Sequence, residues 1–109
     1  MKVDCFVEKP DKQQAKKYIE EGGYLWNAGM FIWNSKTILN QIKIFSRETY
    51  DSLKEIENCS QEMLQKIIDM NYSRTQATSI DYQVLEKAKN IYVIPSDIGW
   101  DDIGSWEAI

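Results

Sequence analysis

The sequence predicts an α/β fold in a single domain. Short runs that are rich in β-branched and aromatic residues, at positions 3–8, 24–33 and 91–95, are typical of strands. Segments whose apolar residues recur at helical spacing lie between these runs and predict helices. The chain has 109 residues, the usual size of one domain, and roughly two thirds of its extended surface could be buried. We therefore expect a genuine hydrophobic core.

The first third of the chain contains two predicted strands around one short helix. Lys12 to Glu20 carries apolar residues at helical spacing. Gly22-Gly23 follows and ends this helix, because glycine accepts the positive φ of a helix C-cap. Residues 24–33 are almost wholly apolar or aromatic, which is typical of a buried strand.

Helices are expected through the middle of the chain. Ser35 is a suitable N-cap for a helix over residues 36–45, whose apolar residues share one face. Residues 46–70 continue the helical pattern, and a break near residues 58–60 predicts two helices joined by a turn. Residues 71–78 are polar and predict a loop.

Two further helix starts are predicted beyond this loop. Ser79 is expected to cap a helix over residues 80–88. Asp81 lies in its first turn, where a carboxylate complements the helix dipole, so we expect a structural role for it. The segment Ser105-Trp106-Glu107 is typical of the first turn of another helix.

Composition and charge exclude several classes of protein. With 13 basic and 17 acidic residues, the net charge is −4, which argues against binding to nucleic acid or to an anionic membrane. Histidine is absent, which excludes a histidine base and imidazole metal ligands. No apolar run approaches about 18 residues and no signal-peptide pattern is visible, so we expect neither a membrane span nor secretion. Cys5 and Cys59 form no zinc-binding or disulfide pattern, so we expect buried or inert thiols in a reduced, cytoplasmic protein.

The first candidate site is the pair Glu8 and Lys9, at the end of the first predicted strand. A carboxylate accepts hydrogen bonds from hydroxyl groups, and an ammonium group provides a point charge for a phosphate. The pair therefore suits a phosphorylated polyhydroxy ligand. Adjacent acidic and basic residues before a proline are also common at a solvated strand end, so this alternative stays open.

The second candidate site lies within the apolar run of residues 24–33. Asn27 is a polar amide that must find partners if it is buried, either in the backbone or on a ligand hydroxyl. Gly29 permits a close approach of the backbone to a ligand. A β-bulge with an asparagine satisfied by the backbone explains the same pattern equally well.

The third candidate site is the acidic loop of residues 99–104, which contains Asp101 and Asp102 between two glycines. Such carboxylates offer oxygen ligands to a hard cation, and Mg²⁺ is usually held by one or two carboxylates together with substrate phosphates. Adjacent acidic residues also occur as solvated loop charges, so the loop alone does not decide between a metal site and a solvated surface loop.

Taken together, four motifs follow one another in an order that resembles a known family. They read Phe-Val-Glu-Lys-Pro (6–10), Trp-Asn-x-Gly-Met-Phe (26–31), Ser-Ile-Asp-Tyr-x-x-x-Glu-Lys (79–87) and Gly-Trp-x-Asp-Ile-Gly-Ser-Trp (99–106). The chain from Phe6 to Trp106 resembles the C-terminal half of the nucleotidyltransferase domain of mannose-1-phosphate guanylyltransferases, including the bifunctional mannose-6-phosphate isomerase form. The resemblance implies the C-terminal portion of a three-layer αβα nucleotide-diphospho-sugar transferase fold. It also implies a Mg²⁺-assisted reaction of mannose 1-phosphate with GTP, giving GDP-mannose and pyrophosphate.

The resemblance also implies a role for each candidate residue. Glu8 and Lys9 would bind the sugar phosphate, and Asn27 with the backbone of Gly29 would hold mannose hydroxyls. Asp102 would be a metal ligand. Phosphoryl-type transfer relies on positioning and charge neutralisation, so the lack of histidine is no obstacle.

Two departures from the family pattern are visible. Asp101 stands where the family usually has a small polar residue, and its role stays open. The family also binds the nucleotide with an N-terminal glycine-rich loop that carries arginine and lysine, whereas the only arginines here, Arg47 and Arg74, have no neighbouring glycines. We therefore expect residues 1–109 to be a partial nucleotidyltransferase domain, with the sugar-phosphate and metal side present and the N-terminal nucleotide-binding half missing. Alone, it should have negligible guanylyltransferase activity.

Two hypotheses without catalysis stay open beside that of a partial nucleotidyltransferase domain. The four tryptophans could stack on sugar rings in a sugar-binding module. Alternatively, apolar surfaces and strand edges could be covered by a second copy of the chain, which would make it a self-associating interaction module and a homo-oligomer.

Overall fold

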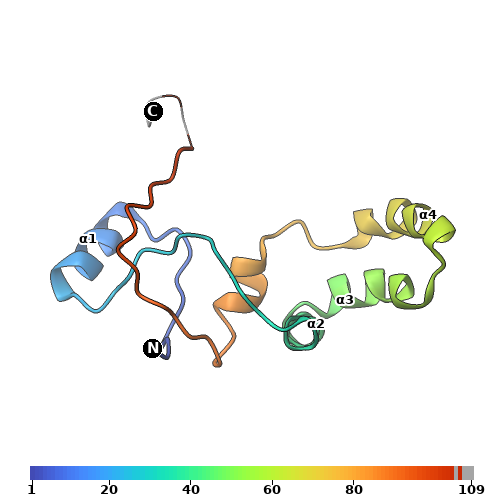
Figure 1. Ribbon diagram of the computed structural model, residues 1–109, viewed down its shortest axis with the longest axis horizontal. Helices are drawn as coiled ribbons and strands as arrows, with labels where there is room; N and C mark the ends of the chain where they lie inside the picture. The colour runs from blue at the N-terminus through green and yellow to red at the C-terminus, as the bar shows by residue number, and fades with distance from the viewer. Residues whose placement is uncertain (105, 107–109) are drawn as a thin grey trace.

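The computed structural model describes residues 1–104 and 106, and its ordered elements are helical. Figure 1 shows α1 on one side of the molecule and α2, α3 and α4 on the other. The four α-helices span Lys12–Glu21 (α1), Ser35–Phe45 (α2), Arg47–Leu53 (α3) and Gln61–Asn71 (α4). The shorter turns span Lys54–Asn58 (η1), Tyr72–Arg74 (η2) and Asp81–Leu85 (η3). The helical turn predicted at Ser105-Trp106-Glu107 falls outside the described residues at its first and last positions.

The predicted helices of the first half are confirmed, with one correction to a cap. Asp11 caps α1 through a carboxylate oxygen that accepts the N–H of Gln14 at 2.8 Å. Gly22, at φ +70°, ends α1 and donates its N–H to the carbonyl of Tyr18 at 3.1 Å. The N-cap of α2 is Asn34, whose side-chain oxygen accepts the N–H of Lys36 at 2.9 Å, and Ser35 is the first helical residue.

Helix α1 stands apart from the other helices. It packs against none of the other described helices, and stacked aromatic rings join its last turn to the following segment. The rings of Tyr18 and Tyr24 lie 4.0 Å apart between centroids and 18° from parallel. Partial burial against this stack, followed by the neighbouring Tyr18, raises the pKa of Tyr24 above its ordinary value.

The predicted strands do not pair into a sheet among the described residues, so the sheet expected from the sequence is not formed by them. The backbone ladder is limited to an antiparallel bridge between Lys2 and Tyr92. Beside this bridge, Val3 donates its N–H to the carbonyl of Ile91 at 2.9 Å, and Val93 donates to Met1 at 2.8 Å. Residues 24–33 are irregular or extended without a partner strand. A strand needs neighbours on which to satisfy its backbone, and strand propensity alone does not supply them.

The hydrophobic core is smaller than the sequence predicts. Among the described residues, the buried hydrophobic side chains are Val84 and Leu85, both in η3, at 2% and 5% exposure. The accessible surface is 9398 Å², whereas a compact protein of this size has roughly 6,300 Å². The radius of gyration is likewise large, at 17.5 Å, against about 13 Å for a compact chain. The expectation of two-thirds burial is therefore wrong for this structure.

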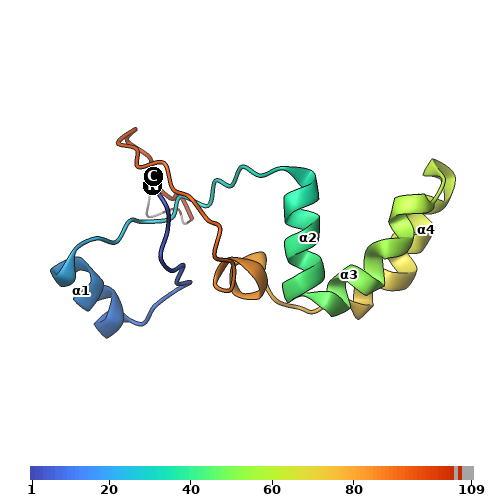
Figure 2. The same cartoon turned by 90° about the horizontal axis from the view of Figure 1, so that it is seen from below.

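The element η3 lies between the helices and the segments that carry the candidate sites. Figure 2 shows it, in orange, between α1 on one side and α2 on the other. It contacts α2, and the buried hydroxyl of Ser46, at the α2–α3 corner, donates a hydrogen bond to the side-chain carbonyl of Gln83. This bond and the two buried apolar residues fix η3 on the helical part of the molecule.

The shape of η3 corrects the predicted helix over residues 80–88. The segment is a π-helical turn, in which the N–H of Glu86 reaches back to the carbonyl of Asp81 at 3.0 Å. Ser79 contributes its backbone carbonyl, which accepts from Gln83 at 3.1 Å, and its side chain forms no cap. Asp81 lies in the first turn as predicted and is half-buried. No helix in the described part of the chain has the length and apolarity needed to cross a membrane.

Candidate functional site

Glu8 and Lys9 form a turn at the end of the N-terminal segment. Lys9 has φ +46°, the one positive φ outside glycine among the described residues. A non-glycine residue in this region is strained and persists where its surroundings hold it in place, often at functional sites. The Lys9 ammonium lies 3.9 Å from a carboxylate oxygen of Glu8, and the two side chains are 80% and 19% exposed, respectively. The turn thus presents one solvent-accessible cation beside a largely covered carboxylate.

A hydrogen bond joins the backbone of this turn to the motif over residues 79–87. The N–H of Glu8 donates to a carboxylate oxygen of Glu86 at 3.0 Å, across 78 positions of sequence. Glu86 follows η3 directly. Glu86 is the glutamate of the Ser-Ile-Asp-Tyr-x-x-x-Glu-Lys motif, and the sequence alone predicted no role for it. Its place in that motif was the only sign in the sequence that it is a functional residue.

Asn27 and Gly29 form a turn of their own. The side-chain oxygen of Asn27 accepts the N–H of Gly29 at 3.0 Å, so the asparagine carbonyl is satisfied by the backbone. The buried strand predicted over residues 24–33 is wrong at this position, because Asn27 is exposed. Gly29 has φ +69°, and nothing lies within 4 Å of where its Cβ would be. In this structure the backbone conformation, rather than close packing, requires glycine at this position.

Aromatic contacts place the first two motifs side by side. The rings of Phe6 and Phe31 meet at 6.4 Å between centroids with a tilt of 56°. Phe31 in turn stacks on Trp33 at 5.6 Å, almost parallel. Phe6 is two residues before Glu8, and Phe31 is two residues after Gly29. These contacts bring the two candidate binding turns into the same region of the molecule.

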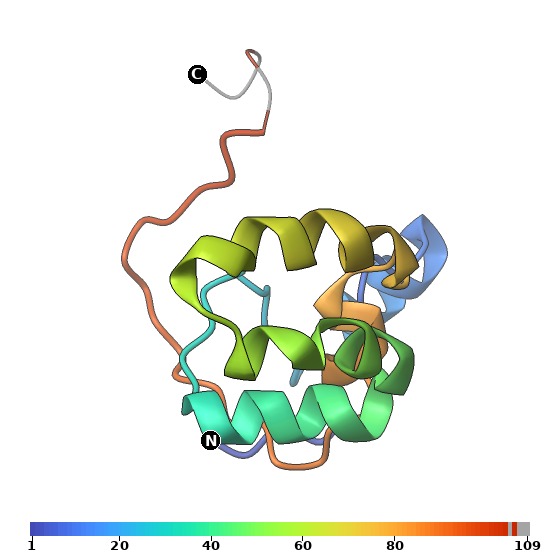
Figure 3. The same cartoon turned by 90° about the vertical axis from the view of Figure 1, so that its right-hand side faces the viewer.

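Asp101 and Asp102 lie in a segment that forms neither a helix nor a strand. Both residues are exposed, and Figure 3 shows the red segment beyond residue 95 running away from the helices. No hydrogen bond or ion pair within the described part of the chain joins Asp102 to Glu8, Lys9 or Asn27. Aromatic contacts therefore bring the first two candidate sites together, and no polar contact among the described residues joins the third to them.

The acidic loop provides part of a ligand set for a magnesium ion. The ligand chemistry fits, since Asp102 offers hard carboxylate oxygens. One of these oxygens folds back to 3.9 Å from the place where a side chain on Gly104 would begin. No group of three metal-binding side chains gathers anywhere in residues 1–104 or at 106. Asp102 would thus supply one ligand, and the remaining ligands would have to come from phosphates, water or other protein groups.

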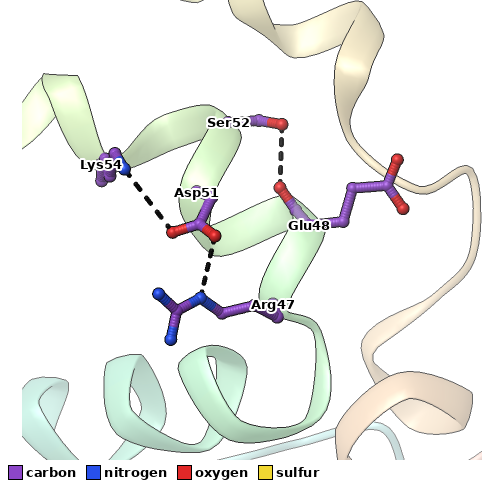
Figure 4. Close-up of polar contacts among 5 residues, drawn as sticks. All are labelled: Arg47, Glu48, Asp51, Ser52 and Lys54. Carbon is purple, nitrogen blue, oxygen red and sulfur yellow. Dashed lines mark hydrogen bonds and ion pairs between the residues drawn. The ribbon is translucent and has the colours of Figure 1, made fainter.

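The two arginines are engaged in the helical part of the molecule, as Figure 4 shows for Arg47. The Nε of Arg47 donates to Asp51 at 2.8 Å, and the ammonium of Lys54 lies 3.7 Å from the other oxygen of Asp51. The hydrogen bond from Arg47 holds the pKa of Asp51 below its ordinary value. Arg74 donates to the side chain of Asn71 at 3.2 Å. Neither arginine belongs to a glycine-rich phosphate loop, in line with the sequence analysis.

An open depression of about 610 Å³ lies elsewhere, along the polar loop of residues 72–79. It contains none of the candidate site residues. The same loop contains local hydrogen bonds, such as that from the hydroxyl of Thr75 to the carbonyl of Tyr72 at 2.7 Å.

Comparison with known proteins identifies the class to which the fold and these motifs belong. The sequence profile described as "Nucleotidyl transferase" matches residues 1–109. The chain belongs to the nucleotidyl transferase family.

Named relatives narrow the resemblance. The chain is 37% identical to alginate biosynthesis protein AlgA of Pseudomonas syringae, over 99% of this chain and 23% of that protein. It is 36% identical to mannose-1-phosphate guanylyltransferase RfbM of Salmonella typhimurium, over 95% of this chain and 22% of the relative. A mannose-1-phosphate guanylyltransferase of Sinorhizobium fredii is 32% identical, over 98% of this chain and 21% of the relative. The chain thus spans less than a quarter of the length of these relatives, and the resemblance seen in its motifs is confirmed. No solved structure matches it.

Proposed function

We propose that this chain is the sugar-phosphate and metal side of a mannose-1-phosphate guanylyltransferase. Such an enzyme transfers GMP from GTP to mannose 1-phosphate, giving GDP-mannose and pyrophosphate. The proposal rests on one observation: nearly the whole chain is similar to proteins of that name, and it carries the four motifs in order.

The turn at Glu8 and Lys9 supports binding of a sugar phosphate. The 3.9 Å pair between the two side chains is loose, and the Lys9 side chain is 80% exposed. A phosphate dianion near this ammonium is a stronger partner than a single carboxylate, because it carries more charge and more acceptor oxygens. The carboxylate of Glu8 is then available to accept hydrogen bonds from sugar hydroxyls.

The turn at Asn27 and Gly29 supports a role in holding mannose hydroxyls. Because the asparagine oxygen accepts from Gly29, the orientation of the exposed amide is set and its NH₂ group points away from that bond. The contact between Phe6 and Phe31 keeps this turn near Glu8. The bound sugar would therefore lie between the two turns.

Magnesium is the proposed cofactor, with Asp102 as one ligand. When bound, Mg²⁺ neutralises phosphate charge during transfer. Asp102 would hold its carboxylate oxygens toward the cation, while Lys9 holds the sugar phosphate.

The three-layer αβα fold belongs to the same proposal. The extended segments at 3–8, 24–33 and 91–95 expose large apolar side chains, including Ile32 at 96% and Ile94 at 82%. These side chains would be covered, and the backbone paired, by strands outside the 109 residues. The loop that binds the GTP phosphates would lie there too. Cytoplasmic location is part of the proposal, since Cys5 and Cys59 are free thiols, which a reducing compartment maintains.

A titration of the chain with mannose 1-phosphate and with GTP, each with and without Mg²⁺, tests this function. We expect mannose 1-phosphate to bind and GTP to bind at least tenfold more weakly, because the described arginines are engaged in the helices. Mannose serves as the control that lacks the phosphate, and it should bind more weakly than its 1-phosphate. Equal binding of mannose and mannose 1-phosphate would contradict the role of Lys9.

Self-association without catalysis is a second candidate, favoured by the exposed apolar surface. Trp26 is 84% exposed and Ile32 is 96% exposed, which is unusual for a monomer. Sedimentation equilibrium distinguishes this function: a concentration-dependent dimer that binds no sugar phosphate would favour it. Binding of free oligosaccharide in place of the phosphate ester would instead favour a sugar-binding module.

A further inference from the structure

The turn at Glu8 and Lys9 needs support from outside its own sequence. Lys9 is held at φ +46°, a left-handed conformation that is unfavourable for a lysine. The following Pro10 adds a restriction, because a residue before proline avoids compact backbone conformations. A free turn would relax, and the two candidate side chains would then lose their common orientation.

The support comes from Glu86. Its carboxylate oxygen accepts the N–H of Glu8 at 3.0 Å, which is a charge-assisted hydrogen bond to the residue immediately before the strained position. The acceptor belongs to the side chain and the donor to the backbone, so the bond fixes the path of the chain and leaves the Glu8 carboxylate free. The nearest backbone hydrogen bond to a distant part of the chain lies five residues earlier, at Val3.

Glu86 itself stands on the best-fixed part of the molecule. It follows η3 directly, after the buried residues Val84 and Leu85. Its own N–H is held by the carbonyl of Asp81, and the Ser46–Gln83 bond ties η3 to the α2–α3 corner. The backbone position of Glu86 is therefore set by the helical part of the molecule, and its exposed side chain reaches from there to Glu8.

We propose that Glu86 is a positioning residue for the sugar-phosphate site: it holds the backbone of Glu8 so that the Glu8 carboxylate and the Lys9 ammonium face one bound sugar phosphate. This inference rests on the proposed function. Glu86 acts through the turn and does not contact the ligand. Through it, the packing of η3 against α2 determines the geometry of a site on a different part of the chain.

The test compares Glu86→Ala with Glu86→Gln in the full chain. Glutamine keeps an oxygen acceptor in the same place, whereas alanine removes it. Glu57→Ala, a change at an exposed glutamate in η1 on the far side of the helices, is the matched control. Two quantities are measured by NMR: the dissociation constant for mannose 1-phosphate and the hydrogen-exchange rate of the Glu8 amide. The amides of Val84 and Leu85 report whether η3 stays folded.

We expect Glu86→Ala to weaken binding of mannose 1-phosphate about tenfold and to speed exchange of the Glu8 amide by a similar factor. Glu86→Gln should lie closer to the unchanged chain than to Glu86→Ala in both measurements, and Glu57→Ala should change neither. Unchanged binding in Glu86→Ala, or an equal loss in Glu86→Gln with η3 still folded, would overturn the inference. If Glu86→Ala unfolds η3, the test is the comparison of Glu86→Gln with the unchanged chain, in mannose 1-phosphate affinity and in exchange of the Glu8 amide. Failure of the unchanged chain to bind mannose 1-phosphate would instead overturn the proposed function.

Discussion

The buried hydroxyl of Ser46 donates a hydrogen bond to the side-chain carbonyl of Gln83 and so joins the α2–α3 corner to η3. The two residues are 37 positions apart, and both are more than 90% buried. Because η3 also holds the buried apolar residues and the attachment point of Glu86, this one bond connects the helices to the candidate binding turn.

Removing this bond should destabilise the chain. Ser46→Ala leaves a buried polar group of Gln83 without its partner, which typically costs about 1–3 kcal/mol of the free energy of unfolding. Replacing both partners, as in Ser46→Ala with Gln83→Leu, should recover most of the loss, because no buried polar group is then stranded. Urea unfolding followed by circular dichroism measures both variants. A double variant that is less stable than Ser46→Ala would contradict this account.

Two substitutions of Lys9 distinguish the effect of its left-handed backbone on stability from the effect of its ammonium on binding. Lys9→Gly should raise the free energy of unfolding by up to about 1 kcal/mol, because glycine adopts φ +46° without strain. Lys9→Ala removes the same ammonium without relieving the strain, so its stability should stay near that of the unchanged chain. Both variants should bind mannose 1-phosphate at least tenfold more weakly. Thermal unfolding and isothermal titration measure the two effects, and equal stabilities of the two variants would argue against strain at this position.

The turn at Asn27 and Gly29 can be tested by an alanine substitution at Gly29, with the same substitution at Gly104 as the control. Gly29→Ala should cost roughly 1–2 kcal/mol of the free energy of unfolding, because alanine at φ +69° is strained even though open space surrounds the position. Gly104→Ala meets only an ordinary contact of 3.9 Å, to the Asp102 carboxylate, and should be close to neutral. Chemical unfolding of the two variants provides the comparison. A Gly29→Ala variant as stable as Gly104→Ala would show that this turn is not ordered as described.

The Arg47–Asp51 pair should make stability depend on acidity. Because the hydrogen bond from Arg47 lowers the pKa of Asp51 in the folded chain, the unfolded chain takes up this proton first as the pH falls. The stabilisation is complete above the ordinary carboxyl pKa near 3.8 and is lost as the pH falls through the lower, folded value. Asp51→Asn should therefore melt below the unchanged chain at neutral pH and approach it in acid. Melting curves from pH 7 to strongly acidic buffer measure this, and a pH-independent gap would refute it.

Asp102 and Asp101 can be distinguished by their effect on magnesium. If Asp102 contributes a ligand, added Mg²⁺ should strengthen binding of mannose 1-phosphate in the unchanged chain and in Asp101→Asn, but not in Asp102→Asn. Calorimetric titrations with Mg²⁺ or with a chelator give the three affinities. The opposite pattern would assign the ligand to Asp101, and an equal Mg²⁺ effect in all three chains would remove both from the metal site.

Much of the helical structure and the family could be predicted from local sequence. Gly22 ends α1 as expected, because caps and helix bonds join residues only a few positions apart. The π-helical form of η3 was not predictable from apolar spacing, because Val84 and Leu85 are buried and η3 contacts α2, and spacing along the chain contains neither fact. The exposure of Asn27 was also missed, since its apolar neighbours remain uncovered in this structure.

By itself, the sequence determined the α-helices of residues 12–45, the motif order and, through the motifs, membership of the nucleotidyl transferase family. Only the tertiary structure decided which distant residues meet: Ser46 with Gln83, Phe6 with Phe31, and Glu8 with Glu86. It also decided that the strand-forming segments stay unpaired apart from the bridge between Lys2 and Tyr92. The physical reason is one of range. A helix satisfies its backbone within a few residues, whereas strand pairing and a side-chain bond across 78 positions depend on how the whole chain packs.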